Sequence, residues 1–130
     1  MNVITQSDAR IGDSRLAQRL RRETAGEVLW SAADRGRYAT DASIYQVEPV
    51  GVLVPRSIAD VEAAMALCRD EGIPVLPRGG GTSQCGQTVN RALVLDCTKY
   101  LREVIGLDPE ARSATVQPGI TLGALNEALK

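Results

Sequence analysis

The residues of this chain that are best suited to chemistry lie together in one glycine-rich stretch, residues 78–87. Its three consecutive glycines, residues 79–81, are followed by the hydroxyl groups of Thr82 and Ser83. Because glycine has no Cβ atom, it can adopt positive φ and lets a ligand approach the backbone closely. Successive N–H groups that turn toward one point suit the oxygens of a phosphate. The stretch therefore predicts a phosphate-binding loop, to which Arg78 would add positive charge.

The glycine-rich stretch differs from two phosphate-binding motifs that also follow strands. A P-loop ends in Gly-Lys-Ser/Thr, whereas this chain has no lysine before Lys99. A Rossmann fingerprint opens a helix, whereas residues 87–90 lead toward a strand. A phosphate bound here would be held by loop amides rather than by a helix dipole. Two plainer interpretations stay open: the glycines form only a flexible turn, and Arg78 faces solvent or forms a structural ion pair.

The composition argues against several classes of site and partner. The chain has no histidine, so neither a Ser-His-Asp nor a Cys-His catalytic centre can be built from it alone. Its three cysteines, Cys68, Cys85 and Cys97, include no Cys-x-x-Cys pair, which argues against a metal site or a disulfide framework. We expect Cys68 to lie in the core and Cys85 to be buried and inert. A net charge of -1, with scattered basic residues, argues against nucleic acid as a partner.

The hydropathy pattern predicts no transmembrane segment. No apolar run approaches the roughly 20 residues that a membrane helix needs, and residues 1–10 lack the basic and apolar regions of a signal peptide. A cytoplasmic protein is therefore expected. Hydrophobic residues make up 44% of the 130 residues and charged residues 24%, which suits one folded core.

Apolar runs and helix-capping residues predict a βαβ unit in the middle of the chain. Residues 50–54 form an apolar run that stops at Pro55, as in a strand buried on both faces. Ser57 caps the following helix and Gly72 ends it. Residues 73–76 predict the second strand, which we expect to lie adjacent and parallel to the first. The apolar stripe of the helix is expected on Ile58, Val61, Ala64, Met65 and Cys68.

The last third of the chain predicts one more strand, a hairpin and a helix. Residues 93–95 form a buried strand, and residues 104–107 and 114–117 flank a turn. Thr121 caps a final helix. The pattern stops abruptly at Lys130, so we expect a fragment of a larger domain, with uncovered apolar faces that make it marginally stable or self-associating. One such face is expected on Leu122, Leu125 and Leu129.

The N-terminal region predicts a helix and an irregular lead-in to the first strand. Asp13 and Ser14 open a short surface helix, and residues 31–45 show no hydrophobic period. We therefore divide the chain into residues 1–45, the helix and lead-in, and residues 46–130, the first part of the main domain. The arginines of the helix are expected on a solvated face rather than at a docking site: Arg19, Arg21 and Arg22.

An ordered set of motifs resembles one known family. From Tyr38 to Lys130 the chain contains YATDASIYQVEPVGVLVPRS, then the capped helix, then VLPRGGGTSQCGQ, then ALVLDCTKYLREVIGLDPEARSATVQPGITLGALNEAL. This set is similar to the FAD-linked oxidases and dehydrogenases of the vanillyl-alcohol oxidase/PCMH type. Within them it looks most like the branch of glycolate oxidase, D-lactate dehydrogenase and D-2-hydroxyglutarate dehydrogenase. The implied fold is α+β, the N-terminal subdomain of a PCMH-type FAD-binding domain, with a βαβ unit followed by a hairpin and a helix.

The resemblance also implies which residues surround the cofactor. The loop from Arg78 to Gly86 would enclose the FAD pyrophosphate, and Gly86 and Gln87 would run toward the flavin. Family members that attach the flavin covalently in this loop have histidine where this chain has Thr82, so the resemblance implies non-covalent FAD. The implied cofactor-binding residues are Pro55, Arg78, Gly79, Gly80, Gly81, Thr82, Ser83, Gln84, Gly86, Gln87, Pro118 and Gly119.

Four residues of the lead-in have both a structural and a functional interpretation. Trp30 is expected to pack with its apolar neighbours rather than to stack on the adenine of FAD. Tyr38, Asp41 and Ser43 match the family's lead-in, and we expect them to hydrogen-bond this segment to itself rather than to act in catalysis.

The function implied by the resemblance is oxidation of a D-2-hydroxy acid by hydride transfer to FAD. In the family the catalytic residues and the substrate-binding cap come later in the chain, so this fragment alone would be inactive. An iron–sulfur cluster would lie in the missing C-terminal region, and an electron-acceptor partner would bring the protein to the periphery of the membrane. The alternative is a non-catalytic nucleotide- or phosphate-binding α/β module.

Overall fold

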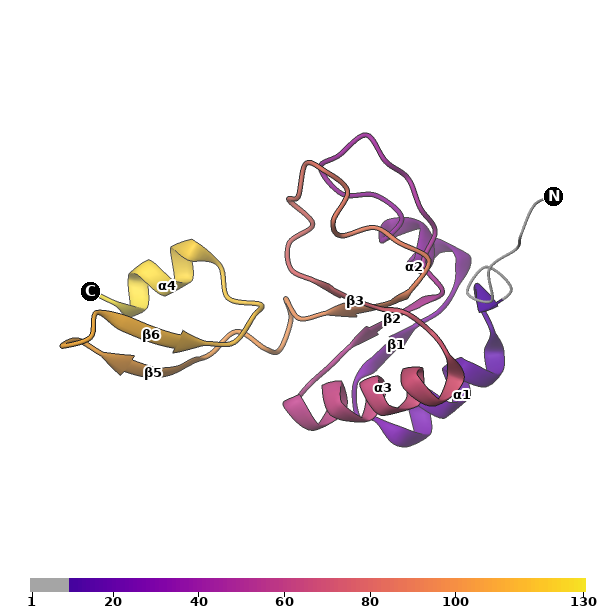
Figure 1. Cartoon of the computed structure of the whole chain (residues 1–130), viewed down its shortest axis with the longest axis horizontal. Coiled ribbons are helices and arrows are strands. Elements are labelled where there is room, and N and C mark those ends of the chain that lie inside the picture. Colours follow the sequence, from indigo (N-terminus) through magenta and orange to yellow (C-terminus); the bar gives the residue numbers. More distant parts are fainter. Residues whose placement is uncertain (1–9) are drawn as a thin grey trace.

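A computed structural model describes residues 10–130, so residues 1–9 of the predicted lead-in lie outside the described residues. The mixed α+β class is confirmed, and none of the described helices is long and apolar enough to cross a membrane. In Figure 1 the hairpin β5–β6 and helix α4 stand to one side of the body formed by the other elements. The elements are α1 (Ser14–Glu23), β1 (Glu27–Leu29), α2 (Ala32–Arg37), β2 (Gly51–Val54), α3 (Ile58–Glu71), β3 (Val75–Arg78), β4 (Leu93–Asp96), β5 (Val104–Asp108), β6 (Ser113–Val116) and α4 (Leu122–Ala128).

The main sheet has the strand order β1-β2-β4-β3. Strand β1 pairs antiparallel with β2, whereas β2 and β3 each pair in parallel with β4. The two strands of the βαβ unit are parallel, as predicted, but the prediction that they are adjacent is wrong. Strand β4 is buried at every position, so it can pair on both sides and occupy the centre of the sheet. The second predicted strand also begins later than expected, at Val75 rather than Ile73.

Helix α3 has the predicted caps. The Ser57 hydroxyl accepts a hydrogen bond from the Asp60 amide at 3.3 Å, and Gly72 ends the helix at φ 65°. The Asp60 carboxylate accepts from the amides of Ala25 and Arg56 and so joins the helix start to the preceding chain.

The apolar face of α3 is rotated from the one predicted. Ala64 and Cys68 are buried as expected, and Leu67 is buried with them. Ile58 and Met65, which were predicted to lie in the stripe, are about half exposed, at 51% and 50%. The inner face of the helix is therefore shifted from the stripe that its sequence period suggests.

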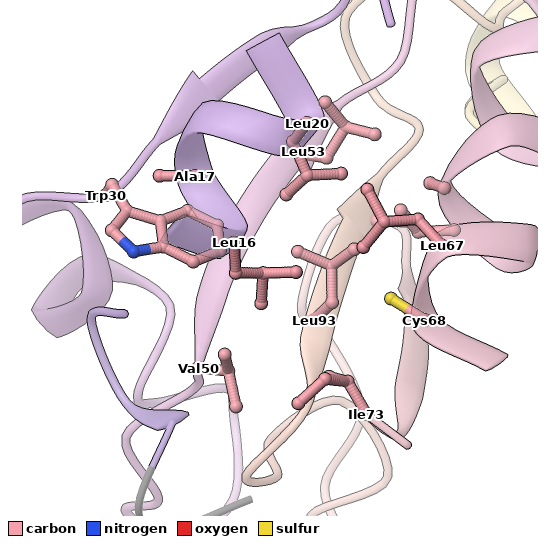
Figure 2. Close-up of a cluster of buried hydrophobic side chains, with 12 residues drawn as sticks. Leu16, Ala17, Leu20, Trp30, Val50, Leu53, Leu67, Cys68, Ile73 and Leu93 are labelled. Carbon is pink, nitrogen blue, oxygen red and sulfur yellow. The ribbon is translucent and has the colours of Figure 1, made fainter. Parts of the chain in front are cut away.

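The core lies between the sheet and the two helices α1 and α3 (Figure 2). Leu16 and Leu20 of α1 meet Leu53, Leu67 and Leu93, and all five are at most 1% exposed. Asp13 caps α1 as predicted, by accepting from the amides of residues 15 and 16.

Ion pairs tie α1, and Arg10 just before it, to α3. The Arg10 Nη2 atom lies 3.0 Å from Glu71 Oε2, and Arg19 Nη1 lies 2.5 Å from Glu71 Oε1. Arg21 and Arg22 are exposed, as predicted, whereas Arg19 is half-buried at this helix contact.

Two elements of the N-terminal region were not predicted. Residues 27–29 form β1 at the edge of the sheet, and residues 32–37 form α2 within the segment predicted to be irregular. A capping box at Ser31 and Asp34 starts α2. Trp30 is 8% exposed and packs in the core, as predicted, and its ring fills the space where a Cβ atom of Gly51 would lie.

The hairpin and final helix form as predicted and leave several of their apolar side chains exposed, although Leu125 is half-buried. Strands β5 and β6 pair antiparallel, and the Thr121 hydroxyl caps α4. Ile105 is 64% exposed and Leu122 is 73% exposed. These two, with the half-exposed Leu107 and Leu129, define the outer apolar face.

We expect the 130-residue chain to self-associate through the outer apolar face, because exposed apolar side chains favour association. Leu122→Glu should shift the chain toward monomer in sedimentation velocity, since a carboxylate in the first turn of α4 is compatible with the helix dipole. As a control, Ile58→Lys removes an exposed apolar residue of α3 and should leave the association unchanged. A wild-type chain that sediments as a monomer at all concentrations would contradict this prediction.

Candidate functional site

Three parallel strands end at one edge of the sheet. Because β2, β3 and β4 run in the same direction, their last residues, Val54, Arg78 and Asp96, lie at a common edge. Pro55 follows the first of these strands and the glycine-rich loop follows the second. Open α/β sheets bind ligands outside the carboxyl ends of their strands. This edge is therefore the candidate site.

The amides of the glycine-rich loop make no hydrogen bonds to the described part of the chain. Within residues 10–130, the N–H groups of residues 79–83 donate no hydrogen bond. A Cβ atom at Gly79 would meet nothing within 4 Å, and one at Gly80 would meet only the Thr82 methyl group, at 3.7 Å. The loop therefore offers open backbone donors, as an anion site requires.

Positive φ occurs at two glycines of the loop, Gly81 at 68° and Gly86 at 80°. Gly79 and Gly80 do not have positive φ. The absence of a side chain at these two positions instead leaves open space beside the backbone. A Cβ atom at Gly81 would lie 2.5 Å from Arg78 Nη2, and one at Gly86 would lie 2.6 Å from the Tyr45 ring. Conformation and neighbours both require glycine at these two positions.

Arg78 is held by backbone carbonyls. Its Nη1 donates to Thr88 O at 3.0 Å and to Tyr38 O at 3.5 Å, and its Nη2 donates to Thr40 O at 2.8 Å. The guanidinium also lies over the Tyr38 ring, 5.3 Å from the centroid. Among the described residues it forms no ion pair, so the structural ion pair is not observed.

Asp41 joins the lead-in to the far end of the loop. Its Oδ1 accepts from the Ser43 amide at 2.8 Å, as the sequence predicts for an internal bond, and its Oδ2 accepts from the Thr88 hydroxyl at 2.9 Å. Hydrogen bonds from Ser43, and then from Thr88, lower the pKa of Asp41 to about 2. Because that pKa lies below its usual value, the stabilisation is present at neutral pH and is lost as the pH falls through about 2.

Tyr38 anchors the start of the lead-in on the end of β4. Its hydroxyl donates to Asp96 Oδ2 at 2.6 Å, while Asp96 Oδ1 accepts from the amide and hydroxyl of Thr98. Burial, and then the bond to Asp96, raises the pKa of Tyr38 above its usual value. The phenol stays protonated, so it serves as a hydrogen-bond donor at this edge of the sheet.

Most of the other predicted side chains of the loop are exposed, and Ser83 is half-buried. Thr82 and Gln84 are exposed, and the Gln87 side chain accepts from the Cys85 amide at 3.2 Å. Cys85 is exposed, so the expectation that it is buried is wrong, because no strand or helix covers this part of the loop. Cys68 is buried, as predicted, and burial raises the pKa of its thiol to about 11.

The residues predicted outside the loop are fixed by backbone packing. Pro55 is fully buried at the end of β2. Gly119 is buried, and its amide donates to Leu101 O at 2.8 Å. A Cβ atom there would lie 1.9 Å from Cys97 O. The Pro118-Gly119 turn is thus attached to the segment that follows β4, although no contact between this turn and the loop is described.

Solved structures share the architecture of this chain over about a quarter of their own length. A structure of p-cresol methylhydroxylase matches 98% of this chain and 25% of its own, with a TM-score of 0.71 and 20% identity. A 4-ethylphenol oxidase from Gulosibacter chungangensis matches 91% of this chain and 24% of its own, with a TM-score of 0.73 and 19% identity. At this identity the likeness shows the fold alone.

The chain belongs to the FAD binding domain family, whose model matches residues 49–130. D-2-hydroxyglutarate dehydrogenase of Escherichia coli is 38% identical over 81% of this chain and 11% of its own length. Glycolate oxidase subunit GlcD of Bacillus subtilis is 37% identical over 69% of this chain and 20% of its own. The resemblance to FAD-linked oxidases and dehydrogenases is confirmed, and the chain spans only 11 to 20% of these two relatives.

Gly81→Ala should destabilise the chain, whereas Gly79→Ala should not. The first change forces alanine to positive φ and against the Arg78 guanidinium, and we expect a loss of about 1 to 2 kcal/mol in the free energy of unfolding. The second enters open space at an exposed position, where changes are usually within about 0.5 kcal/mol. Urea unfolding followed by Trp30 fluorescence measures both. Equal effects of the two variants would show that the turn at Gly81 does not constrain the loop.

Proposed function

We propose that this chain forms one side of an FAD site, in which the loop from Arg78 to Gly86 holds the pyrophosphate and Gln87 leads toward the flavin. The observation that carries this proposal is the run of loop amides at residues 79–83, which have no acceptor within residues 10–130. Pro55 and the Pro118-Gly119 turn line other parts of the cofactor. Membership of the FAD binding domain family supports the choice of ligand.

The residues at the loop suit a diphosphate. The space at Gly79 and Gly80 lets phosphate oxygens reach the backbone, and the hydroxyls of Thr82 and Ser83 add donors. The Arg78 charge is not cancelled by an ion pair among the described residues. Because the chain has no histidine, a histidyl link to the flavin cannot form in this loop, which supports non-covalent binding.

We propose further that the whole protein oxidises a D-2-hydroxy acid of the lactate, glycolate or 2-hydroxyglutarate class. When bound, FAD would accept the hydride, and this chain's residues would bind and orient the cofactor. The support is the similarity to relatives named for these substrates, including a mitochondrial D-lactate dehydrogenase [cytochrome] of Kluyveromyces lactis, 39% identical over 62% of this chain and 15% of its own length. No residue of this chain is proposed to be catalytic.

The wider proposal places the remaining components outside this chain. These are the rest of the cofactor site, the catalytic residues, an iron–sulfur cluster and an electron acceptor that brings a cytoplasmic protein to the membrane periphery. A second candidate function is a non-catalytic nucleotide- or phosphate-binding module, which is favoured by one observation: free amides suit any phosphate, not FAD alone.

Gly80→Val should abolish FAD retention in the full-length protein that carries this chain, whereas Thr82→Ala should only weaken it. The valine side chain would occupy the open space through which a phosphate oxygen reaches the loop. The alanine removes one hydroxyl donor, worth about 1 to 3 kcal/mol toward a charged acceptor. The FAD content after gel filtration measures both effects, and full retention by Gly80→Val would refute the loop assignment.

Three controls complete this experiment. All flavin should stay in solution when the protein is precipitated with acid, and flavin that precipitates with the protein would refute non-covalent binding. ADP should compete with FAD because it carries the diphosphate, whereas riboflavin, which lacks it, should compete poorly. Binding of ADP without any binding of FAD would favour the non-catalytic module.

The full-length protein should reduce an artificial electron acceptor when it is given a D-2-hydroxy acid. The panel consists of lactate, glycolate and 2-hydroxyglutarate, with L-enantiomers of the chiral acids as matched controls. We expect D-selective bleaching of the bound flavin under anaerobic conditions and no turnover by the 130-residue chain alone. Bound FAD that none of the panel reduces would overturn the substrate class while leaving the cofactor proposal intact.

A further inference from the structure

The glycine-rich loop lies beside the lead-in segment, here residues 38–47 (Figure 1). Hydrogen bonds attach the loop to this segment at three points. Arg78, at the start of the loop, donates to the carbonyls of Tyr38 and Thr40 in this segment. In the middle of the loop, Gly81 O accepts from the Ala42 amide at 3.0 Å. Thr88, which directly follows the glycine-rich stretch and forms the far end of the loop, is bound to Asp41 of the lead-in segment.

The side chains of Asp41 and Arg78 both bind Thr88 at the far end of the loop. The Asp41 carboxylate accepts from the hydroxyl of Thr88 at 2.9 Å and from its amide at 3.4 Å, and the carbonyl of Thr88 accepts from Arg78 at 3.0 Å. One guanidinium therefore joins the first residue of the loop, its far end and the lead-in. The attachments use residues 78, 81 and 88 and leave the amides of residues 79–83 unoccupied.

We propose that the lead-in segment is a clamp that fixes the shape of the cofactor loop, and that Asp41 and Arg78 are positioning residues that set FAD affinity through loop order. This inference rests on the proposed function of the loop. A loop that is ordered before binding loses less conformational entropy when the ligand arrives, so its affinity is higher. Arg78 affects FAD affinity mainly through the carbonyls that it joins, and its positive charge beside the diphosphate contributes less.

Removing the charge of Asp41 tests the clamp, because the clamp and simple electrostatics predict opposite changes in FAD affinity. A carboxylate near a bound diphosphate repels it, so electrostatics alone predicts that Asp41→Asn tightens FAD binding. The clamp predicts the opposite, because asparagine has one acceptor oxygen in place of two and turns an N–H group toward the donors of Ser43 or Thr88. The two explanations therefore differ in direction and not only in size.

The variant Arg78→Lys distinguishes the hydrogen-bonding geometry of the guanidinium from its positive charge. Lysine keeps the positive charge but cannot reproduce the planar fork that reaches the carbonyls of Tyr38, Thr40 and Thr88. If Arg78 serves as a charge, the variant keeps most of the affinity. If it serves as a clamp, the variant loses about as much affinity as Arg78→Gln, which lacks both the charge and the fork.

The experiment measures the Kd for FAD in the full-length protein and its dependence on salt. We expect Asp41→Asn and Arg78→Lys each to raise the Kd about tenfold, the size of effect expected for lost hydrogen bonds to charged groups. The salt dependence should stay that of wild type. Glu62→Gln is the matched control: it removes one acidic charge from an exposed position on α3 and should leave the Kd unchanged. Tighter or unchanged binding by Asp41→Asn, or near-wild-type binding by Arg78→Lys, would overturn the clamp.

Hydrogen–deuterium exchange separates the clamp from the FAD proposal. Without FAD, a peptide covering residues 79–90 should exchange faster in both variants than in wild type, while a peptide from β4 should not change. Thr88→Val, which removes a single hydroxyl bond and no charge, should show the same change more weakly and guards against variants that fail to fold. If wild type binds no FAD, the proposed function fails while this exchange still decides the clamp, and unchanged exchange would refute it.

Discussion

The parallel pairing of β4 with both β2 and β3 is the constraint on which the rest of the structure depends. This pairing gives the three strands one direction and one carboxyl edge, and the loop, Pro55 and the turn after Asp96 all begin there. Asp96 also accepts the Tyr38 hydroxyl, so the position of β4 decides where the lead-in segment can be fixed. The site therefore depends on one buried strand that contributes no residue to the loop.

The two charged residues beside the loop are held by neutral groups. Arg78 donates to carbonyl oxygens, and Asp41 accepts from N–H and O–H groups. An ion pair would hold each side chain equally well, but it would cancel the charge. Neutral partners fix the positions of Arg78 and Asp41 without cancelling their charges. The two charges therefore act at fixed positions beside the loop.

The features that could be predicted from the sequence are those decided by neighbouring residues. The caps at Asp13, Ser57 and Thr121 form as expected, and so does the hairpin, because each depends on contacts within a few residues. The place of β4 could not be predicted, since an apolar run shows that a strand is buried but not which strands lie beside it. The edge strand β1 is only three residues long and gives too short a pattern to identify.

At the site, too, features that depend on neighbouring residues could be predicted, whereas contacts between distant residues could not. The glycine-rich loop was found from its composition. The expectation that Asp41 and Ser43 bond the lead-in to itself is met by the bond from the Ser43 amide to Asp41. The bond between Asp41 and Thr88 joins residues 47 positions apart, and no local signal marks it. Arg78 could be interpreted in three ways from the sequence, because the carbonyls that bind it belong to the backbone and have no sequence signature.

The strand order also has a consequence for how the chain is made. Strand β4 is synthesised after β2 and β3 but lies between them, so neither of these strands has its parallel partner until residue 96 has left the ribosome. Until then their unpaired edges are open to other chains, which is a known hazard of exposed strands. The arrival of β4 gives β2 and β3 their shared parallel partner, after which β1 and β3 are the edge strands of the described sheet.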